Sequence, residues 1–242
     1  MRLRVVTYNV HKCRGMDRRV RPQRIVEVLR EIDADVIALQ EVLSVPGGRP
    51  EDDQAHFIAE QLKLSHTVGG TRQLRGGIYG NVVLSRWPIT ATQNYDISVR
   101  GREQRGCLRA DVEAIGGSPL HVFNVHLGTA YLERRHQGRR LIDEAILNNG
   151  ELSGPRLMLG DFNEWTRGLA SRLLASHLVS ADVRLHLPRA RTYPGVLPLL
   201  HLDHIYYEDA LQLEAMTLYR TRLSLMASDH LPLVADFQMR LD

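Results

Sequence analysis

The sequence contains little lysine and little cysteine. Lys12 and Lys63 are its two lysines, and Cys13 and Cys107 are its two cysteines. Two cysteines form neither a disulfide framework nor a recognisable metal-binding pattern, so we interpret them as free thiols in a reduced compartment. Arginine carries nearly all the positive charge, yet the net charge is only +3. Arginine suits phosphate-bearing partners, but an arginine-rich codon usage explains most of this excess more simply.

Other features are absent altogether. No apolar run approaches the length of a membrane span, and residues 1–4 lead into a strand pattern without the apolar core of a signal peptide. No linker, internal repeat or low-complexity run divides the chain. We therefore expect a cytoplasmic protein without stable membrane insertion, built as a single domain over residues 1–242. The sequence does not indicate the oligomeric state.

Apolar patterns alternate between the periods of strands and helices. They predict strands at 3–9, 36–40, 78–84, 89–97, 108–115, 120–127, 156–160, 202–207, 211–218 and 231–238, and helices at 22–30, 55–62, 131–147 and 168–176. A turn at 116–119 would join two of the strands as a hairpin. Helices separate some strands while others meet as hairpins, which predicts an α/β fold of two mixed sheets packed face to face with helices outside.

Polar side chains mark the ends of several apolar runs. The run 157–160 ends in Asp161-Phe162-Asn163, and Asp229-His230 precedes the last predicted strand. Asn9 and Glu41 follow two further apolar runs near the N-terminus. Residues two apart in a strand share a face, so such ends can present several oxygens together. Convergent oxygens on a rigid sheet are typical of a Mg²⁺ site.

Seven short motifs stand in one order along nearly the whole chain. They are Thr7-Tyr8-Asn9-Val10-His11, Leu39-Gln40-Glu41-Val42, Gly80-Asn81 with the strand after it, Asn124-Val125-His126-Leu127, Gly160-Asp161-Phe162-Asn163, Leu202-Asp203-His204-Ile205 and Ser228-Asp229-His230-Leu231-Pro232. Together they resemble the endonuclease/exonuclease/phosphatase (DNase I-like) superfamily, in particular its small bacterial members. The resemblance implies a four-layered α/β/β/α sandwich.

The resemblance also implies a metal site. Glu41 would be the principal ligand of Mg²⁺ or Mn²⁺, with Asn9 and Asp229 as direct or water-mediated ligands. Mg²⁺ retains several waters and takes one or two carboxylates, so this small set of ligands is sufficient. From the residues alone, Asn9 is equally well explained as a turn residue at the end of a strand.

The same resemblance implies roles in catalysis. Asp161 would orient or deprotonate the attacking water, and Asn163 would bind a phosphate oxygen, although both also suit a helix cap. Asp203 would hold His230 beside the phosphate, and the two meet if their strands are neighbours in one sheet. His126 would serve the leaving oxygen as a proton donor.

Four further residues are candidates for substrate binding. Arg105 would lie at the edge of the cleft, although an exposed strand arginine is an equal alternative, and Asn81 would line the cleft unless it only forms a turn. His11 and Lys12 stand where many nucleases of the family carry an acidic residue, and they would add phosphate affinity. Nucleic acid contacts would come from Arg105 and from Arg72 and Arg75 in a predicted loop, 71–77.

The sequence therefore predicts a metal-dependent phosphoesterase, with a phosphodiester as the expected substrate and nucleic acid as the leading substrate class. Two alternatives remain open. The first is a phospholipid or small-molecule phosphodiesterase or phosphatase. The second is a binding module that has kept the fold but lost turnover, which the complete polar set from Asn9 to His230 disfavours.

Overall fold

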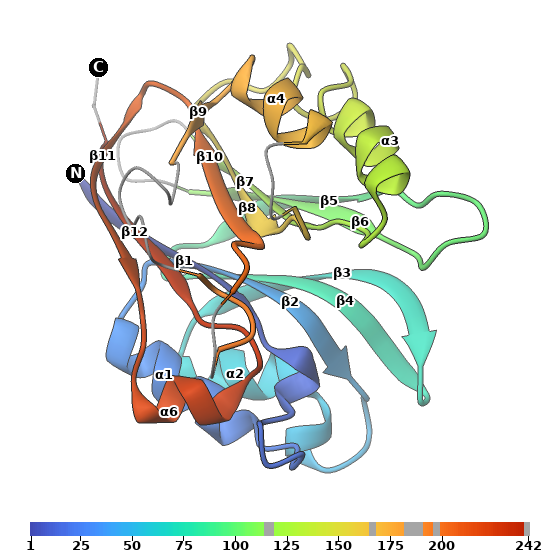
Figure 1. Cartoon of the computed structure of the whole chain (residues 1–242). Coiled ribbons are helices and arrows are strands. Elements are labelled where there is room, and N and C mark those ends of the chain that lie inside the picture. Colours follow the sequence, from blue (N-terminus) through green and yellow to red (C-terminus); the bar gives the residue numbers. More distant parts are fainter. Residues whose placement is uncertain (114–118, 165–167, 182–190, 196–198, 240–242) are drawn as a thin grey trace.

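The chain folds into two stacked sheets covered by helices (Figure 1). This computed structural model describes residues 1–113, 119–164, 168–181, 191–195 and 199–239. Each sheet has six strands, and the helices lie on the two outer faces. The layers follow one another as helix, sheet, sheet and helix, which confirms the predicted α/β/β/α sandwich.

The first sheet has the strand order β11-β12-β1-β2-β4-β3. Its strands are β1 (Arg2–Asn9), β2 (Val36–Ser44), β3 (Ser65–Leu74), β4 (Gly77–Ser85), β11 (Leu211–Leu218) and β12 (Leu233–Met239). Strands β1 and β2 are parallel, and the remaining neighbours are antiparallel. The sheet is therefore mixed, as expected.

The second sheet has the strand order β5-β6-β7-β8-β10-β9. Its strands are β5 (Ile89–Asp96), β6 (Gly106–Val112), β7 (Leu120–His126), β8 (Arg156–Asp161), β9 (Val179–Ser180) and β10 (Asp203–Tyr207). Here β7 and β8 form the parallel pair. Both sheets thus carry one parallel pair near their centre, and the site described below lies at the ends of these strands.

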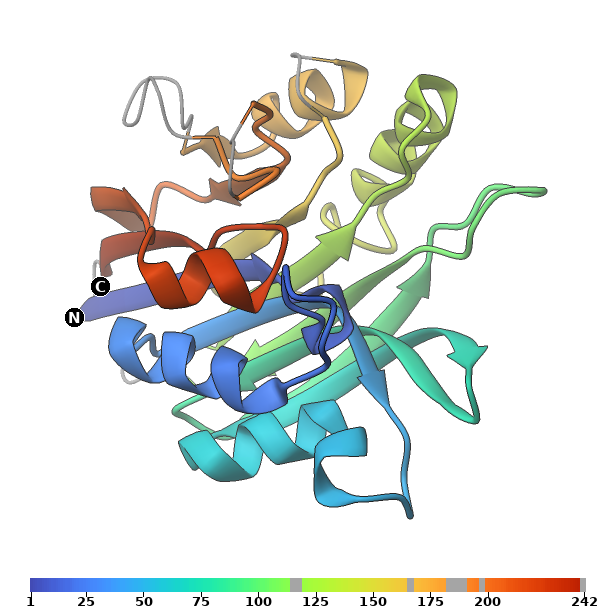
Figure 2. The same ribbon diagram turned by 60° about the horizontal axis from the view of Figure 1, so that its bottom comes forward.

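Helices cover each sheet on its outer side, as Figures 1 and 2 show. Helices α1 (Pro22–Ile32), α2 (Gln54–Leu62) and α6 (Arg222–Ala227) pack on the first sheet, and α3 (Tyr131–Leu141) and α4 (Leu169–Ala175) on the second. Two short 3₁₀ helices, η1 (His11–Cys13) and η2 (Pro50–Asp52), precede α1 and α2.

Helix α1 illustrates how the sequence sets these elements. Pro22 is its first residue, where a missing N–H costs no helical hydrogen bond. Ile25, Leu29 and Ile32 recur at helical spacing and are buried against the sheet. Asp33 ends the helix in the left-handed conformation.

The apolar core continues between the sheets. Val5 and Val83 of the first sheet pack in one cluster with Leu108 and Leu159 of the second. Further clusters lie between each sheet and its helices. This packing fixes the two sheets against each other and so fixes the relative position of their strand ends.

Three predicted elements differ from the structure. The predicted strand 36–40 continues as β2 to Ser44, so Glu41 lies inside the strand and not after it. The predicted helix 131–147 ends at Leu141, although Ile146 and Leu147 in the turns beyond it are buried. Because these two residues are buried, the apolar pattern in the sequence continues past the point where the helix ends. The predicted loop 71–77 is instead the end of β3 and a tight turn before β4. Strand β3 lies at a sheet edge and has few buried residues, so its sequence carries no clear alternation.

Two other expectations concern a predicted turn and the absence of a membrane span. The predicted turn at 116–119 falls largely outside the described residues. Among the residues that are described, no helix combines the length and the apolar character needed to cross a bilayer.

Candidate functional site

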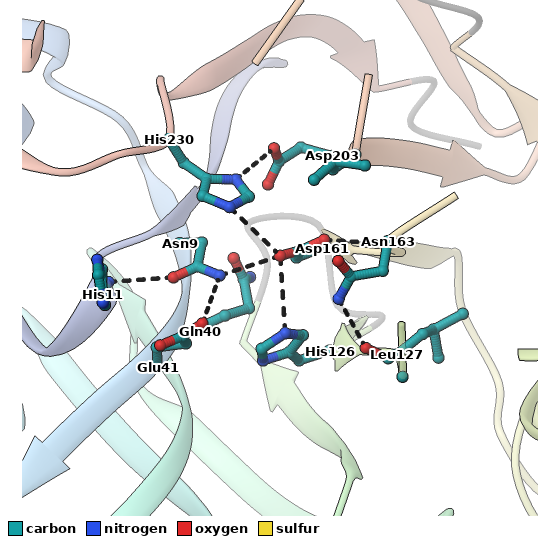
Figure 3. A network of polar contacts seen from close by, with 12 residues as sticks. Asn9, His11, Gln40, Glu41, His126, Leu127, Asp161, Asn163, Asp203 and His230 are labelled. Carbon is teal, nitrogen blue, oxygen red and sulfur yellow. Dashed lines mark hydrogen bonds and ion pairs between the residues drawn. The ribbon is translucent and has the colours of Figure 1, made fainter. Parts of the chain in front are cut away.

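Strand register brings the predicted site residues together at one end of the sandwich. In the first sheet, Asn9 at the end of β1 lies opposite Gln40 in β2. In the second sheet, Asp161 at the end of β8 lies between His126 of β7 and Asp203 of β10. These side chains converge in the space shown in Figure 3.

Asp161 is the centre of this cluster. Its side chain is buried, and the residue is only 1% exposed. Oδ2 accepts a hydrogen bond from Asn9 Nδ2 at 3.0 Å, and it lies 3.6 Å from His126 Nε2 and 3.7 Å from His230 Nε2 (Figure 3). Oδ1 accepts the backbone N–H of Asn163 at 2.9 Å. One carboxylate is thus held by residues from both sheets.

His230 is held by the predicted carboxylate. Its Nδ1 lies 3.1 Å from Oδ2 of Asp203, which is fully buried. Burial alone lowers the pKa of His230, but the nearby charges of Asp203 and Asp161 outweigh it and raise the pKa to about 10. The expected contact and the expected raised pKa are both confirmed, and His230 is an imidazolium at neutral pH.

The route to this contact differs from the one expected. Asp203 begins β10 in the second sheet, whereas His230 precedes β12 in the first. The strands are therefore not neighbours in one sheet, and the pair bridges the two sheets. Stacked sheets lie about 10 Å apart, a gap that two side chains reaching from facing strand ends can close.

His126 has the opposite protonation. Burial lowers its pKa to about 4 and prevails over the attraction of Asp161; Arg105 contributes in the same direction as burial. His126 is therefore neutral at neutral pH. Two imidazoles of different charge thus face the same oxygen of Asp161, an arrangement that separates the donor and acceptor functions of the site.

Glu41 is the carboxylate expected to be the principal metal ligand. Its carboxylate lies 2.7 Å from the ammonium of Lys12 and accepts a hydrogen bond from Asn9 Nδ2 at 3.2 Å. Burial raises the pKa of Glu41, but His126 and Lys12 outweigh burial and leave the pKa well below its ordinary value. Glu41 is therefore a carboxylate at any physiological pH.

Asp229 lies against the imidazole of His11. His11 Nδ1 lies 3.2 Å from its Oδ2. Burial raises the pKa of Asp229, whereas His11 and the charge of His230 lower it, and the net shift is downward. His11 and Lys12 thus each face one of the two carboxylates expected at the metal.

The donor chemistry fits a magnesium ion with few protein ligands. Glu41 and Asp229 are both carboxylates, and the charge of Glu41 acts to raise the pKa of Asp229. No cluster of three or more acidic, histidine or cysteine side chains suited to a metal occurs among the described residues. Mg²⁺ takes one or two carboxylates from a protein and keeps several waters, so a pair of carboxylates fits such an ion.

Asn9 presents its amide nitrogen, rather than its oxygen, to the carboxylates. Its Nδ2 donates to Glu41 and Asp161, and its Oδ1 accepts the backbone N–H of His11 at 3.0 Å (Figure 3). Because only the amide oxygen can accept the N–H of His11, this hydrogen bond identifies the oxygen and the nitrogen of the Asn9 amide. Direct ligation by Asn9 would require its amide to turn over, whereas its present orientation links Glu41 with Asp161.

The backbone around the site is strained. His11, Lys12 and Cys13 are three consecutive non-glycine residues with positive φ, and Glu41 and Asn163 also have positive φ, at 58° and 49°. Such conformations cost free energy for residues with a side chain and persist where their surroundings impose them. The β2 strand also changes register against β4 between Leu39 and Val42, which re-aims Glu41.

Buried amides fasten the two sheets next to the site. Asn124 of β7 donates to the carbonyls of Leu39 and Val82 in the first sheet, and accepts from Gln40 Nε2 at 2.8 Å. Asn81 is 1% exposed and donates to the carbonyls of Gly106 and Asn124. Asn81 therefore joins the sheets beside the site.

Arg105 is buried rather than exposed, and it pairs with Glu103 at 2.8 Å. Glu103 also pairs with Arg72 at 2.8 Å. Arg105 borders a small enclosed space together with Glu41 and His126. The arginine expected at the edge of the cleft thus contributes positive charge directly beside the acid and the neutral imidazole.

The motifs did not reveal two tyrosines. Tyr79 is buried beside Glu41, with Arg72 over its ring at 4.7 Å. Tyr193 packs against His230 with ring centres 4.9 Å apart, and burial together with Asp229 raises its pKa. Tyr79 immediately precedes the Gly80-Asn81 motif, a signal that was available, whereas nothing in the sequence around Tyr193 distinguishes it.

Two six-stranded sheets with an acid, amide and imidazole cluster at their strand ends define a DNase I-like fold. The model of the Endonuclease/Exonuclease/phosphatase family matches residues 6–230, and the chain belongs to that family. The chain is 34% identical to the uncharacterized protein YbhP of Escherichia coli K12, over 98% of this chain and 96% of YbhP.

Solved structures share the fold. The catalytic domain of human Nocturnin, with bound sulfate, superposes with a TM-score of 0.79 at 21% identity, over 99% of this chain and 95% of that one. A mannosyl-6-phosphatase from Bacteroides thetaiotaomicron superposes with a TM-score of 0.79 at 16% identity, over 98% and 100%. At these identities the likeness establishes the fold.

Proposed function

We propose that the protein is a divalent-metal-dependent phosphodiesterase that directs water onto phosphorus. The observation that carries this proposal is the cluster at Asp161, where one buried carboxylate faces a cationic and a neutral imidazole. Family membership supports it at the level of the reaction class, because the family comprises nucleases and phosphatases.

The residues around Asp161 have separate roles in the proposed reaction. Asp161 orients the attacking water and accepts its proton. His230, kept cationic by Asp203, stabilises the negative charge that develops on the phosphoryl oxygens. Asn163 binds a phosphate oxygen. His126 lies on the other side of Asp161, and because it is neutral it donates a hydrogen bond to the leaving oxygen and does not supply the proton that the sequence suggested.

Glu41 and Asp229 would hold the metal. When bound, Mg²⁺ or Mn²⁺ polarises a phosphoryl oxygen and offsets charge on the leaving group. The chain contributes the two carboxylates in their ionised form, because the pKa of each lies below its ordinary value. Asn9 ties this half of the site to Asp161 through its amide.

Nucleic acid is the substrate class we favour. Arg72, Arg75 and Arg105 lie on the side of the site formed by β3, β4 and the start of β6, which suits a partner with several phosphates. A phospholipid or small phosphodiester is the second candidate. A silent binding module is disfavoured, because the polar set from Asn9 to His230 is complete and converges on the buried Asp161.

A generic diester tests this proposal without assuming the substrate. Hydrolysis of bis(p-nitrophenyl) phosphate with Mg²⁺ is expected, and Asp161→Asn should abolish most of it. Asp111→Asn is the matched control, since Asp111 is also buried and also contacts an imidazole, that of His121, at 2.7 Å at the other end of β7. Equal losses in the two variants, or no hydrolysis by the wild type, would overturn the proposal.

A further inference from the structure

A second pocket adjoins the site on the side of the first sheet. It has a volume of about 650 Å³ and lies between the start of α1, the connection from β2 to α2, and the turn between β3 and β4. Lys12 lines this pocket and also contacts Glu41 at 2.7 Å. Lys12 therefore links the pocket to the carboxylate proposed for the metal.

The rim of the pocket is cationic. Arg21, Arg49 and Arg75 line it together with Lys12, against the acids Glu51 and Asp52. Asp52 is paired with Arg49. In the described part of the chain, the side chains of Arg21 and Arg75 form no ion pair or hydrogen bond, so two guanidinium groups remain for an anion.

The floor of the pocket is apolar. Leu43, Val45 and Phe57 line it, and Phe57 is half-buried with an aromatic face. An apolar floor under a cationic rim suits a ligand that carries both a flat ring and an anionic group. Arginine binds phosphate oxygens with two parallel donors, and an aromatic side chain stacks on a base.

Buried Gln54 holds the wall of this pocket in place. Its Oε1 accepts the backbone N–H of Leu43 at 3.1 Å, and its Nε2 donates to the backbone carbonyl of Lys12 at 2.8 Å. The floor is thereby linked to η1, the segment that carries Lys12 and His11 toward the site. The side chain of Gln54 therefore connects the pocket to the segment that leads into the site.

We propose that this pocket binds the nucleotide unit next to the scissile phosphate, with its base against Phe57 and its own phosphate between Arg21 and Arg75. This inference rests on the proposed function, because it assigns the substrate class of the same site. Zwitterionic lipid head groups fit less well, because the arginine rim repels their ammonium group. A simple sugar phosphate leaves the apolar floor uncovered.

Binding can be measured apart from turnover. Anisotropy of a fluorescein-labelled single-stranded oligonucleotide, in excess chelator, reports affinity for the full chain without hydrolysis. Arg21→Gln/Arg75→Gln should weaken binding by at least ~10-fold and make the salt dependence shallower by up to about two released ions. Phe57→Leu should weaken binding while leaving the salt dependence as it is.

Arg139→Gln is the matched control, because Arg139 is an exposed arginine on α3, on the opposite face of the sandwich. It should bind like the wild type. Equal binding by the double variant and the wild type would overturn the inference. So would displacement of the oligonucleotide by glycerophosphocholine as effectively as by an unlabelled dinucleotide.

Generic turnover separates this inference from the proposed function. The single variant Arg21→Gln should hydrolyse bis(p-nitrophenyl) phosphate within about twofold of the wild type, because that diester has no second phosphate to occupy the rim. If the wild type binds the oligonucleotide through these arginines but hydrolyses no diester, the pocket stands and the phosphodiesterase proposal fails. If the diester is hydrolysed but the arginine substitutions leave oligonucleotide binding unchanged, the phosphodiesterase proposal stands and the pocket inference fails.

Discussion

Asp203 Oδ2 lies 3.1 Å from Nδ1 of His230, and the contact joins the second sheet to the loop before the last strand of the first. The carboxylate is fully buried, and its Oδ1 has no hydrogen-bond partner among the described residues. An isolated buried carboxylate is costly, so the imidazolium stabilises the acid as much as the acid stabilises the imidazolium.

Asp203→Asn should shift the pH–rate profile. Removing the carboxylate removes the first cause of the raised His230 pKa, about 10 in the intact protein, so the imidazolium is lost at a lower pH. The alkaline limb should therefore move to lower pH and the maximal rate should fall, with metal affinity nearly unchanged. The double variant Asp203→Asn/His230→Ala should be little worse than the worse single variant. Additive losses would show that the two residues act separately.

The two histidines should affect stability in opposite pH ranges. His230 has its pKa raised from 6.5 to about 10, so its contribution is complete below pH 6.5 and is lost as pH rises toward 10. His126 has its pKa lowered from 6.5 to about 4, so it destabilises the fold progressively as pH falls from 6.5 to 4. Urea unfolding of His126→Asn and His230→Asn at pH 5 and pH 9 measures both.

The loss in free energy of unfolding that His126→Asn causes relative to the wild type should be smaller at pH 5 than at pH 9. His230→Asn should show a larger deficit at pH 5 than at pH 9. Parallel curves for both variants and the wild type would contradict the assigned protonation states.

Asp161→Asn should remove turnover without unfolding the protein. The amide is nearly isosteric, yet it cannot accept the proton of the attacking water, so we expect a loss of roughly 10²–10⁴-fold in kcat. Circular dichroism should show a melting temperature close to that of the wild type. A sharp fall in melting temperature with turnover retained would mean that Asp161 only organises the turn into Asn163, whose N–H it accepts at 2.9 Å.

Mg²⁺ or Mn²⁺ should support activity, and a chelator should abolish it, because the proposed ligands are oxygens. Glu41→Gln should greatly weaken metal binding in calorimetry, since it removes the charge that the lowered pKa of Glu41 preserves. Glu144→Gln, at an exposed acid after α3, provides the control. Full activity in excess chelator would exclude the metal mechanism.

Lys12→Met should tighten metal binding. The ammonium lies 2.7 Å from Glu41 Oε2, so an incoming divalent cation has to compete with it. The same variant should raise the KM for a phosphodiester, because Lys12 also borders the second pocket. Lys63→Met, the other lysine and an exposed one, is the matched control. An unchanged calorimetric affinity for Mg²⁺ would show that the Lys12 ammonium does not compete with the metal for Glu41.

The sequence predicted the layers and the members of the central cluster because both depend on local patterns. Apolar alternation located the strands, and Asn9 and Asp161 stand where two of those strands end. Glu41 lies inside β2, at the irregularity between Leu39 and Val42, and the motif around it located it. The raised pKa of His230 also followed from the sequence, because a neighbouring carboxylate has one direction of effect.

The sequence could not supply relations that depend on how the two sheets pack. It did not reveal that Asp203 and His230 belong to different sheets, or that Lys12 lies against Glu41. Tyr193 reaches His230 from a segment with no distinguishing pattern. These contacts are made between residues far apart in the chain, and a period of two or 3.6 carries no information about them.

The hydrogen bond from Asn9 to Asp161, 3.0 Å long, runs from the first sheet to the second. Its length therefore depends on the alignment of the whole sandwich, including apolar residues of the core between the sheets such as Val83 and Leu108. Small volume changes in that distant core would misalign the reacting groups while the protein stayed folded. The rate of reaction is then a more sensitive measure of core packing than the melting temperature.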